Sequence, residues 1–159
     1  MHDHKVYVID QDQAVRESTR WLLQAAGWAC ETYDSALSFL RQCSSPRALR
    51  GCIIVDAQMP VMDGLELQQL LRDLGANIPV LVTTGYGDIQ EAVTALRRGA
   101  QDYLEKPFER GRLLEQVRHA MGTHPPATPR VRPLPIEKPG NGSSPALDQV
   151  SWALVQPPS

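Results

Sequence analysis

The sequence contains no run of apolar residues that approaches the length of a membrane-spanning helix. It also lacks an excess of charge, because 16 lysines and arginines face 18 aspartates and glutamates in 159 residues. So small a net charge gives no electrostatic basis for binding nucleic acid or an anionic membrane. The opening MHDHKVYVID has no apolar signal core and passes directly into a strand pattern. We therefore expect a cytoplasmic protein that binds neither nucleic acid nor membrane.

Cysteine is scarce as well. Only Cys30, Cys43 and Cys52 occur, and their odd number and irregular spacing match neither a metal-binding pattern nor a set of paired disulfides. Free thiols in structural positions are what a reducing cytosol allows. This composition excludes a structural zinc site and a disulfide-stabilised secreted module.

Proline is sparse in the first three quarters of the chain and abundant in the last. Nine of the 13 prolines lie in residues 122–159, around the segment GNGSS. A segment of this composition buries too little apolar surface to offset the entropy lost on ordering. We predict one folded domain over residues 1–121 and a Pro-rich, mostly disordered tail over residues 122–159.

In the first part of the chain, short apolar runs alternate with segments of helical periodicity. The expected strands are residues 6–9, 28–33, 52–55, 79–83 and 102–105, and an amphipathic segment follows each of them. Continuous apolar strands joined by helical connections are typical of a parallel sheet that helices cover on both faces. The sequence therefore predicts an α/β protein with a doubly wound, five-stranded parallel sheet.

Polar side chains follow the carboxyl ends of four of these strands. They are Asp10 and Asp12, Asp56, Thr84 and Lys106. In a doubly wound sheet, a site lies beyond these ends, where the strand order reverses. Carboxylates, a hydroxyl and an amine together suit phosphoryl transfer, which needs an oxygen nucleophile, a hard cation such as Mg²⁺ and donors to the phosphate oxygens. Singly, each residue fits a helix cap or a solvated side chain; together they favour a site.

Three motifs make the interpretation more specific. They are IIVDAQMPVMDG at 53–64, TGYGD at 84–88 and GAQDYLEKPF at 99–108. In this combination they resemble the receiver domain of two-component response regulators, in its FixJ-like and NtrC-like branches. The resemblance covers roughly residues 4–121. It implies a flavodoxin-like (βα)5 fold with strand order 2-1-3-4-5.

The resemblance also implies a role for each residue of the site. Asp56 would accept a phosphoryl group from a phosphohistidine of a sensor histidine kinase. Mg²⁺ would be held by Asp10, by Asp56 and by the backbone carbonyl of Gln58. Thr84 and Lys106 would bind the phosphoryl group. The chain would thus be a phosphoacceptor in a phosphorelay rather than an enzyme, apart from its own phosphorylation by small donors and its own dephosphorylation.

Other positions would carry the signal onward. Tyr103 matches the aromatic switch position, whose ring moves when Thr84 moves. Ala57, Gly85 and Tyr86 would border the site. Phosphorylation would change the surface formed by residues 88–121, through which an unknown output protein, or a second copy of the chain in a homodimer, would bind.

One position departs from the family pattern. Receivers carry two adjacent acids at the end of the first strand, and here the second position is Gln11. An amide oxygen is a weaker ligand for a hard cation. Asp12 either substitutes as a ligand or caps the helix that starts near Gln13, and the sequence leaves both open. We expect Mg²⁺ binding to be weakened but not lost.

Two alternatives compete with the receiver interpretation. A haloacid-dehalogenase-like phosphatase would use Asp10 as nucleophile and Asp12 as acid/base. However, the Gly-Thr or similar pair expected next is Gln13-Ala14, and Asp56 would have no role. The other alternative is a truncated DNA-binding response regulator, since relatives carry a helix-turn-helix domain for which residues 122–159 show no pattern.

Overall fold

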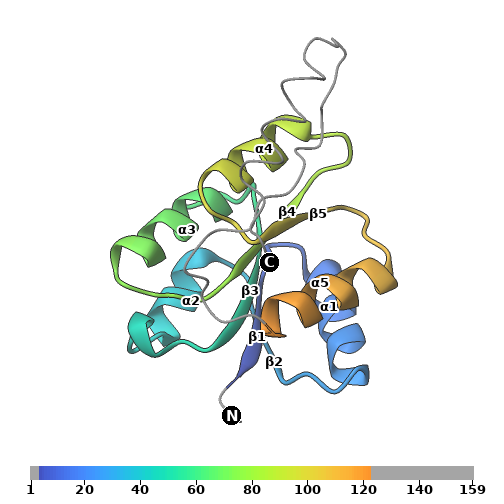
Figure 1. Ribbon diagram of the computed structural model, residues 1–159, viewed down its shortest axis with the longest axis horizontal. Coiled ribbons are helices and arrows are strands. Elements are labelled where there is room, and N and C mark those ends of the chain that lie inside the picture. Colours follow the sequence, from blue (N-terminus) through green and yellow to red (C-terminus); the bar gives the residue numbers. More distant parts are fainter. Residues whose placement is uncertain (1–3, 123–159) are drawn as a thin grey trace, which may run out of the picture.

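The computed structural model describes residues 4–122, which form one parallel sheet with helices on both faces (Figure 1). The sheet has five strands in the order β2-β1-β3-β4-β5, and every neighbouring pair is parallel. The predicted fold class and strand order are confirmed. The strands are β1 (Lys5–Ile9), β2 (Cys30–Tyr33), β3 (Gly51–Asp56), β4 (Val80–Thr84) and β5 (Asp102–Glu105).

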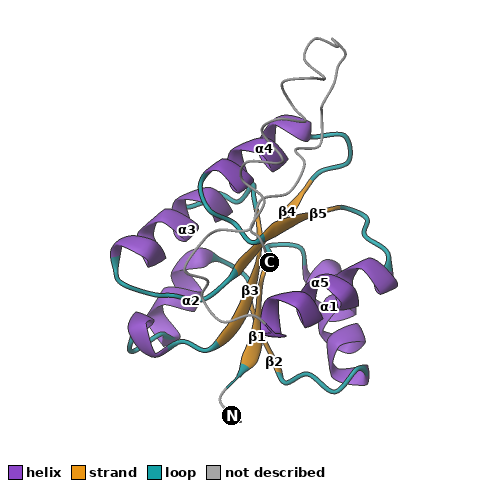
Figure 2. Ribbon diagram, viewed as in Figure 1, coloured by secondary structure: helices purple, strands orange, loops and turns teal. Residues whose placement is uncertain are grey.

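A helix follows each strand. Figure 2 shows α2, α3 and α4 on one face of the sheet and α1 and α5 on the other. A short 3-10 turn (Pro46–Ala48) precedes β3. The helices are α1 (Gln13–Ala25), α2 (Ala36–Gln42), α3 (Gly64–Asp73), α4 (Ile89–Arg97) and α5 (Arg110–Gly122).

Four of the five strands differ from the prediction at one or both ends. β1 begins one residue earlier than predicted, and β3 is one residue longer at each end. β2 begins at Cys30 rather than at residue 28, and β4 covers Val80–Thr84 rather than 79–83. Pro79 has no N–H, and although its carbonyl accepts a hydrogen bond from Ile53, it does not continue the ladder. At the other end of β4, Thr84 pairs with Glu105, so it is the last residue of the strand instead of the first residue after it.

Strand alternation divides the core into two layers. Ile9, Val55 and Val82 point to the face covered by α2, α3 and α4, where Phe39, Leu67 and Leu71 pack on them. The intervening strand residues point to the opposite face, covered by α1 and α5. That second layer contains Val6, Val8, Ile54, Leu81, Leu104, Leu23, Leu113 and Val117. Each fully buried aliphatic side chain stabilises the fold by about 1.5–3 kcal/mol.

Short polar side chains fix where the helices begin. Ser35 caps α2 by accepting a hydrogen bond from the Ser38 N–H. Asp88 caps α4 by accepting a hydrogen bond from the Glu91 N–H. A full capping box, which the sequence interpretation missed, starts α3, because Asp63 and Glu66 each accept the other's backbone N–H at 2.9 Å.

Only Gly122 of the predicted tail belongs to the described part of the chain, as the last residue of α5; residues 123–159 lie outside it. Within residues 4–122, no helix is both long and apolar enough to cross a membrane. The cysteines are free thiols, with Cys52 buried and Cys30 and Cys43 half-buried.

Gly64 allows α3 to start directly against β3. A Cβ atom at this position would lie 2.4 Å from the carbonyl oxygen of Asp56, which is backbone and cannot rotate away. We expect Gly64→Ala to lower the free energy of unfolding by about 1–3 kcal/mol, measured by urea denaturation. Gly111→Ala in α5 is the matched control, because its Cβ would meet nothing within 4 Å. A Gly64→Ala protein as stable as the wild type would contradict this packing.

Candidate functional site

Three charged side chains meet beyond the carboxyl ends of β1, β3 and β5. The Lys106 Nζ atom donates hydrogen bonds to Asp10 Oδ2 at 2.7 Å and to Asp56 Oδ2 at 3.1 Å. Asp10 is almost fully buried, whereas Asp56 and Lys106 keep partial access to solvent. The structure thus brings together three of the residues that the sequence placed at separate strand ends.

The register of the sheet explains this convergence. Ile9 pairs with Val55 across β1 and β3, so the next residues, Asp10 and Asp56, emerge side by side. Ile9 and Val55 point to the α2/α3/α4 face, so the acids that follow them project toward the α1/α5 face. Lys106 projects toward the same face, because it lies two residues beyond Leu104, which packs there. The strand order β1-β3-β4-β5 then makes the long lysine side chain the group that spans the gap.

Burial and charge shift the pKa values of the site in defined directions. Burial raises the pKa of Asp56 above its ordinary value, and the nearby charge of Asp10 adds to the effect, against the opposing Gln58 N–H and Lys106 ammonium. Burial alone would lower the pKa of Lys106, but its hydrogen bond to Asp10 and the charges of Asp10 and Asp56 outweigh burial and raise it. Lys106 is therefore a cation held between two carboxylates.

Backbone groups and one arginine hold the two acids in place. The Asp12 N–H donates to Asp10 Oδ1 at 2.9 Å, and the Gln58 N–H donates to Asp56 Oδ1 at 3.0 Å. Arg16 Nη1 donates to the Asp10 carbonyl at 2.7 Å. The sequence interpretation missed Arg16, for which the only signal is its place in the first turn of α1.

The side chain of Asp12 is occupied at the start of α1. Its Oδ1 accepts the Ala14 N–H at 2.9 Å and the Val15 N–H, which is the capping interpretation that the sequence left open. A role for Asp12 as a metal ligand stays a prediction. Gln11, which stands where receivers carry an acid, is exposed.

Thr84 and Tyr103 lie on the other face of the sheet. Thr84 is buried, and its carbonyl accepts the Lys106 N–H at 2.8 Å. Val82 pairs with Tyr103, and Thr84 follows Val82 by two positions, so Thr84 and Tyr103 share the α2/α3/α4 face. Tyr103 is half-buried. This placement puts the predicted hydroxyl and the predicted aromatic switch next to each other on one side of β4 and β5.

The loops around the site differ in exposure. Ala57 is buried and its N–H donates to the Thr83 carbonyl at 2.9 Å, while Gly85 and Tyr86 are exposed. The Gly87 N–H donates to the Glu105 carboxylate, a contact that ties the β4–α4 loop to β5. Sequence reasoning missed this contact, because it joins a loop to a strand 18 residues away with no local pattern.

The donor atoms suit a hard cation. Asp10 and Asp56 already share one positive group, the Lys106 ammonium, so their oxygens converge on a common point. Carboxylate and carbonyl oxygens are the ligands that Mg²⁺ takes in proteins. Across residues 4–122, however, no three His, Cys, Asp or Glu side chains are grouped closely enough to hold a metal ion. A Mg²⁺ ion here would depend on two carboxylates, the Gln58 carbonyl and water.

The comparison with known families agrees with this geometry. Residues 6–118 match the family model of the response regulator receiver domain. The chain belongs to the response regulator receiver domain family. Phosphorelay signalling is therefore its class of function, and the comparisons give no support to the haloacid-dehalogenase-like alternative.

Relatives of this receiver include two named regulators. It is 45% identical over 117 residues to the transcriptional regulatory protein FixJ of Azorhizobium caulinodans, covering 74% of this chain and 54% of FixJ. It is 39% identical over 120 residues to the response regulator protein TodT of Pseudomonas putida, covering 76% of this chain and 52% of TodT. The chain thus spans about half the length of these relatives.

Solved structures give the same fold. The crystal structure of FixJ-N superposes with a TM-score of 0.70 and 39% identity, over 76% of this chain and 95% of that one. The receiver domain of NtrX from Brucella abortus gives a TM-score of 0.69 and 29% identity, over 75% and 99% of the two chains. Both agreements extend over nearly the whole of the solved receiver domains.

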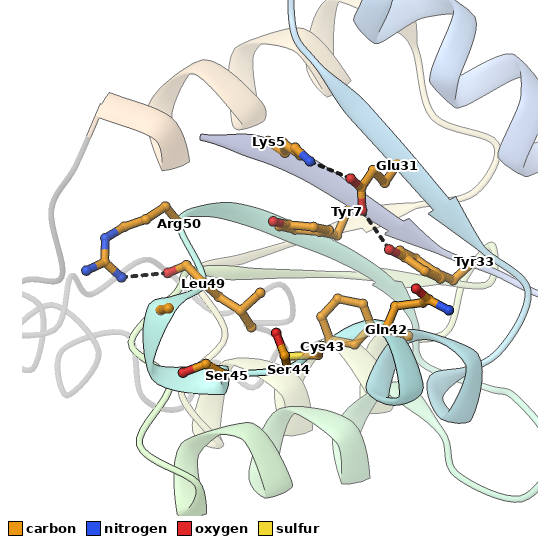
Figure 3. Close-up of a pocket in the computed structure, with 12 residues that line it drawn as sticks. Lys5, Tyr7, Glu31, Tyr33, Gln42, Cys43, Ser44, Ser45, Leu49 and Arg50 are labelled. Carbon is orange, nitrogen blue, oxygen red and sulfur yellow. Dashed lines mark hydrogen bonds and ion pairs between the residues drawn. The ribbon is translucent and has the colours of Figure 1, made fainter. Parts of the chain in front are cut away.

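A separate hollow lies between the sheet and the segment that joins α2 to β3 (Figure 3). Its volume is about 330 Å³, and Tyr7, Tyr33 and Phe39 line its inner wall. Glu31 accepts hydrogen bonds from Lys5 and, at 2.6 Å, from the Tyr33 hydroxyl. These bonds, that to Lys5 first, lower the pKa of Glu31. Lys5 and Glu31 thus neutralise each other's charge. The hollow begins at the amino end of β1, whereas Lys106 lies at the carboxyl ends of the strands.

The raised pKa of Asp56 leads to a prediction about stability. A carboxyl with a raised pKa in the folded state contributes stability when protonated, and that contribution is lost as the pH rises through the folded pKa. At pH 7.5 the ionised group therefore destabilises the fold. We expect Asp56→Asn to have a higher free energy of unfolding than the wild type at pH 7.5, and a smaller gain below the ordinary carboxyl pKa of 3.8.

Urea denaturation at both pH values measures this difference. Asp73→Asn is the matched control, because it removes the same charge from an exposed position on α3 and should change stability by less than about 0.5 kcal/mol. If Asp56→Asn were less stable than the wild type at pH 7.5, the conclusion that the ionised Asp56 carboxylate destabilises the fold would be wrong.

Proposed function

We propose that this receiver accepts a phosphoryl group on Asp56 from a phosphohistidine of a sensor histidine kinase and so changes a protein-binding surface. The observation that carries the proposal is the Lys106 ammonium shared by Asp10 and Asp56 at the carboxyl ends of the strands. A carboxylate that is partly accessible, flanked by a cation and hydrogen-bonded by one backbone N–H is placed to act as a nucleophile.

In the transfer, an oxygen of Asp56 attacks phosphorus and the P–N bond to the histidine breaks. The imidazole leaves with the electron pair of that bond, and an acyl phosphate forms on Asp56. The Gln58 N–H keeps one carboxyl oxygen of Asp56 oriented throughout. The new group adds about 1.5–2 negative charges, and Lys106 supplies the nearest ammonium to compensate them.

Asp10, Asp56 and the Gln58 carbonyl would hold Mg²⁺. When bound, the ion supplies positive charge at the phosphoryl oxygens. Asp10 remains oriented by the Asp12 N–H and by Arg16 at its carbonyl, so its carboxylate does not need metal to keep its position. Gln11 leaves the site one carboxylate short of the family pattern.

The output of the switch would be a change in protein contacts. Thr84 would turn toward the phosphoryl group, and Tyr103, on the same face, would follow. The changed surface is that of residues 88–121, which carries the exposed Arg97, Arg98 and Arg112. An output protein or a second copy of the chain would bind there.

We further infer that the chain is a phosphoacceptor rather than an enzyme with a separate substrate. Because its relatives include transcriptional regulators of about twice the matched length, it acts either alone or as the receiver of a longer regulator. The receiver would occupy residues 1–121 and the Pro-rich composition would mark residues 122–159 as an extension.

Acetyl phosphate tests the acceptor directly. We expect the wild-type chain, incubated with acetyl phosphate and Mg²⁺, to gain the mass of one phosphoryl group, and Asp56→Asn to gain none. Intact-mass spectrometry detects the adduct, and peptide mapping locates it. Asp12→Asn, at an exposed acid close by, should still be labelled. Label that persists on Asp56→Asn would show that another residue is the acceptor.

Restoring the missing acid tests the metal site. We expect Gln11→Asp to bind Mg²⁺ about tenfold more tightly than the wild type, because a carboxylate is a stronger ligand than an amide for a hard cation. Isothermal titration with Mg²⁺ measures the affinity. Gln13→Asp adds the same charge in the first turn of α1 and should leave the affinity nearly unchanged. Equal Mg²⁺ affinities for Gln11→Asp and the wild type would contradict the claim that Gln11 weakens metal binding.

A further inference from the structure

The hydroxyl of Thr83 is an unused polar group next to the acceptor. Thr83 is only 2% exposed, and within residues 4–122 its Oγ1 atom has no hydrogen-bond partner. Buried polar groups are normally paired, because an unpaired one loses its contacts with water without replacement. An unpaired hydroxyl at this place is therefore a reason to look for a state of the protein in which it finds a partner.

The register puts this hydroxyl beside Asp56. Thr83 pairs with Asp56 on one side and with Leu104 on the other. Paired residues of parallel strands point to the same face, and neighbouring strands lie about 4.8 Å apart. Thr83 therefore projects toward the α1/α5 face together with Asp56, whereas the adjacent Thr84 projects toward the opposite face.

The Lys106 side chain passes the same point. It leaves the end of β5 and reaches Asp56 on β3 and Asp10 on β1, so it crosses β4. On the α1/α5 face, Thr83 is the β4 residue at that level. The hydroxyl thus lies where the ammonium of Lys106 and the carboxyl group of Asp56 meet, without bonding to either in the resting structure.

We propose that Thr83 is a positioning residue of the acceptor, whose hydroxyl donates a hydrogen bond to the carboxyl group of Asp56 once Lys106 turns to the phosphoryl oxygens. The proposal rests on the proposed function of Asp56. In the resting state, Asp56 Oδ2 accepts from Lys106 and Oδ1 accepts from Gln58. After transfer, Lys106 pairs with the new charge, and the carboxyl group has one donor fewer. The Thr83 hydroxyl, on the strand position paired with Asp56, is the unpaired donor that would replace it.

This arrangement favours the phosphorylated state over the resting state. The hydroxyl is unpaired before transfer and paired after it, so its contribution belongs to the acyl phosphate alone. The two consecutive threonines would then bind different parts of the acyl phosphate. Thr84 would bind the phosphoryl group, and Thr83 would bind the carboxyl group that carries it. Removing the Thr83 hydroxyl should shorten the lifetime of the acyl phosphate and leave the resting fold intact.

The experiment compares Thr83→Val, which removes the hydroxyl and keeps the shape, with Thr83→Ser, which keeps a hydroxyl. Thr19→Val is the matched control, because Thr19 is 1% exposed and its Oγ1 is also buried without a partner, on α1. Each full-length protein is labelled with acetyl phosphate and Mg²⁺, the donor is removed, and loss of the adduct is followed by intact mass. We expect label to be lost about three- to tenfold faster from Thr83→Val, and at the wild-type rate from Thr83→Ser and Thr19→Val.

Each other outcome overturns the proposal in a recognisable way. A wild-type lifetime in Thr83→Val, or equal acceleration in Thr19→Val, removes the role of this hydroxyl and leaves Asp56 as acceptor. A lower urea midpoint of unlabelled Thr83→Val than of Thr19→Val would show that the Thr83 hydroxyl is already paired at rest. That result would also contradict the proposed role of Thr83. Failure of the wild type itself to take label overturns the proposed function, and the role of Thr83 falls with it.

Discussion

The site depends on one cation between a buried acid, Asp10, and a partly buried one, Asp56. Asp10 and Asp56 emerge next to each other because their strands are neighbours, and like charges at this separation disfavour each other in a partly buried site. The Lys106 ammonium, 2.7 and 3.1 Å from the two carboxylates, offsets that repulsion. It also ties the last strand to the first and third, so any change in the charge at Asp56 acts on β5 as well.

Alternation along β4 separates chemistry from output. Thr83 faces the acceptor, while Thr84 faces the layer that contains α4 and Tyr103. In the proposed function, a phosphoryl group that attracted the Thr84 hydroxyl would move the end of a strand that packs on α4. The backbone bond from the Lys106 N–H to the Thr84 carbonyl makes the two sides depend on each other. Coupling between the two faces would need no long pathway, since Thr83 and Thr84 are consecutive residues that face opposite sides of the sheet.

Much of the fold and of the site followed from local patterns. Continuous apolar strands, the amphipathic segments between them and the three motifs predicted five βα units and the residues at their ends. What could not be predicted joins parts far apart in the sequence. The contact of Gly87 with Glu105 depends on how the β4–α4 loop lies against the end of β5. Alternation along a strand already implies that Thr83 and Thr84 face opposite sides, but only the register shows that Thr83 is the one beside Asp56. Asp63 is a different case, since its capping box is visible in the sequence.

Position 11 changes the charge balance on which the site rests. Two carboxylates and one ammonium leave a formal charge of −1 around Asp56, whereas a second acid next to Asp10 would make it −2. The resting site therefore has less repulsion to relieve, and a divalent ion would gain less by binding to it. The same loss of charge would make it easier for an anionic phosphoryl donor to approach. In the proposed function, weaker metal binding and a less repulsive pocket would act in opposite directions on phosphorylation, and Lys106 is the group that compensates the two acids in the resting structure.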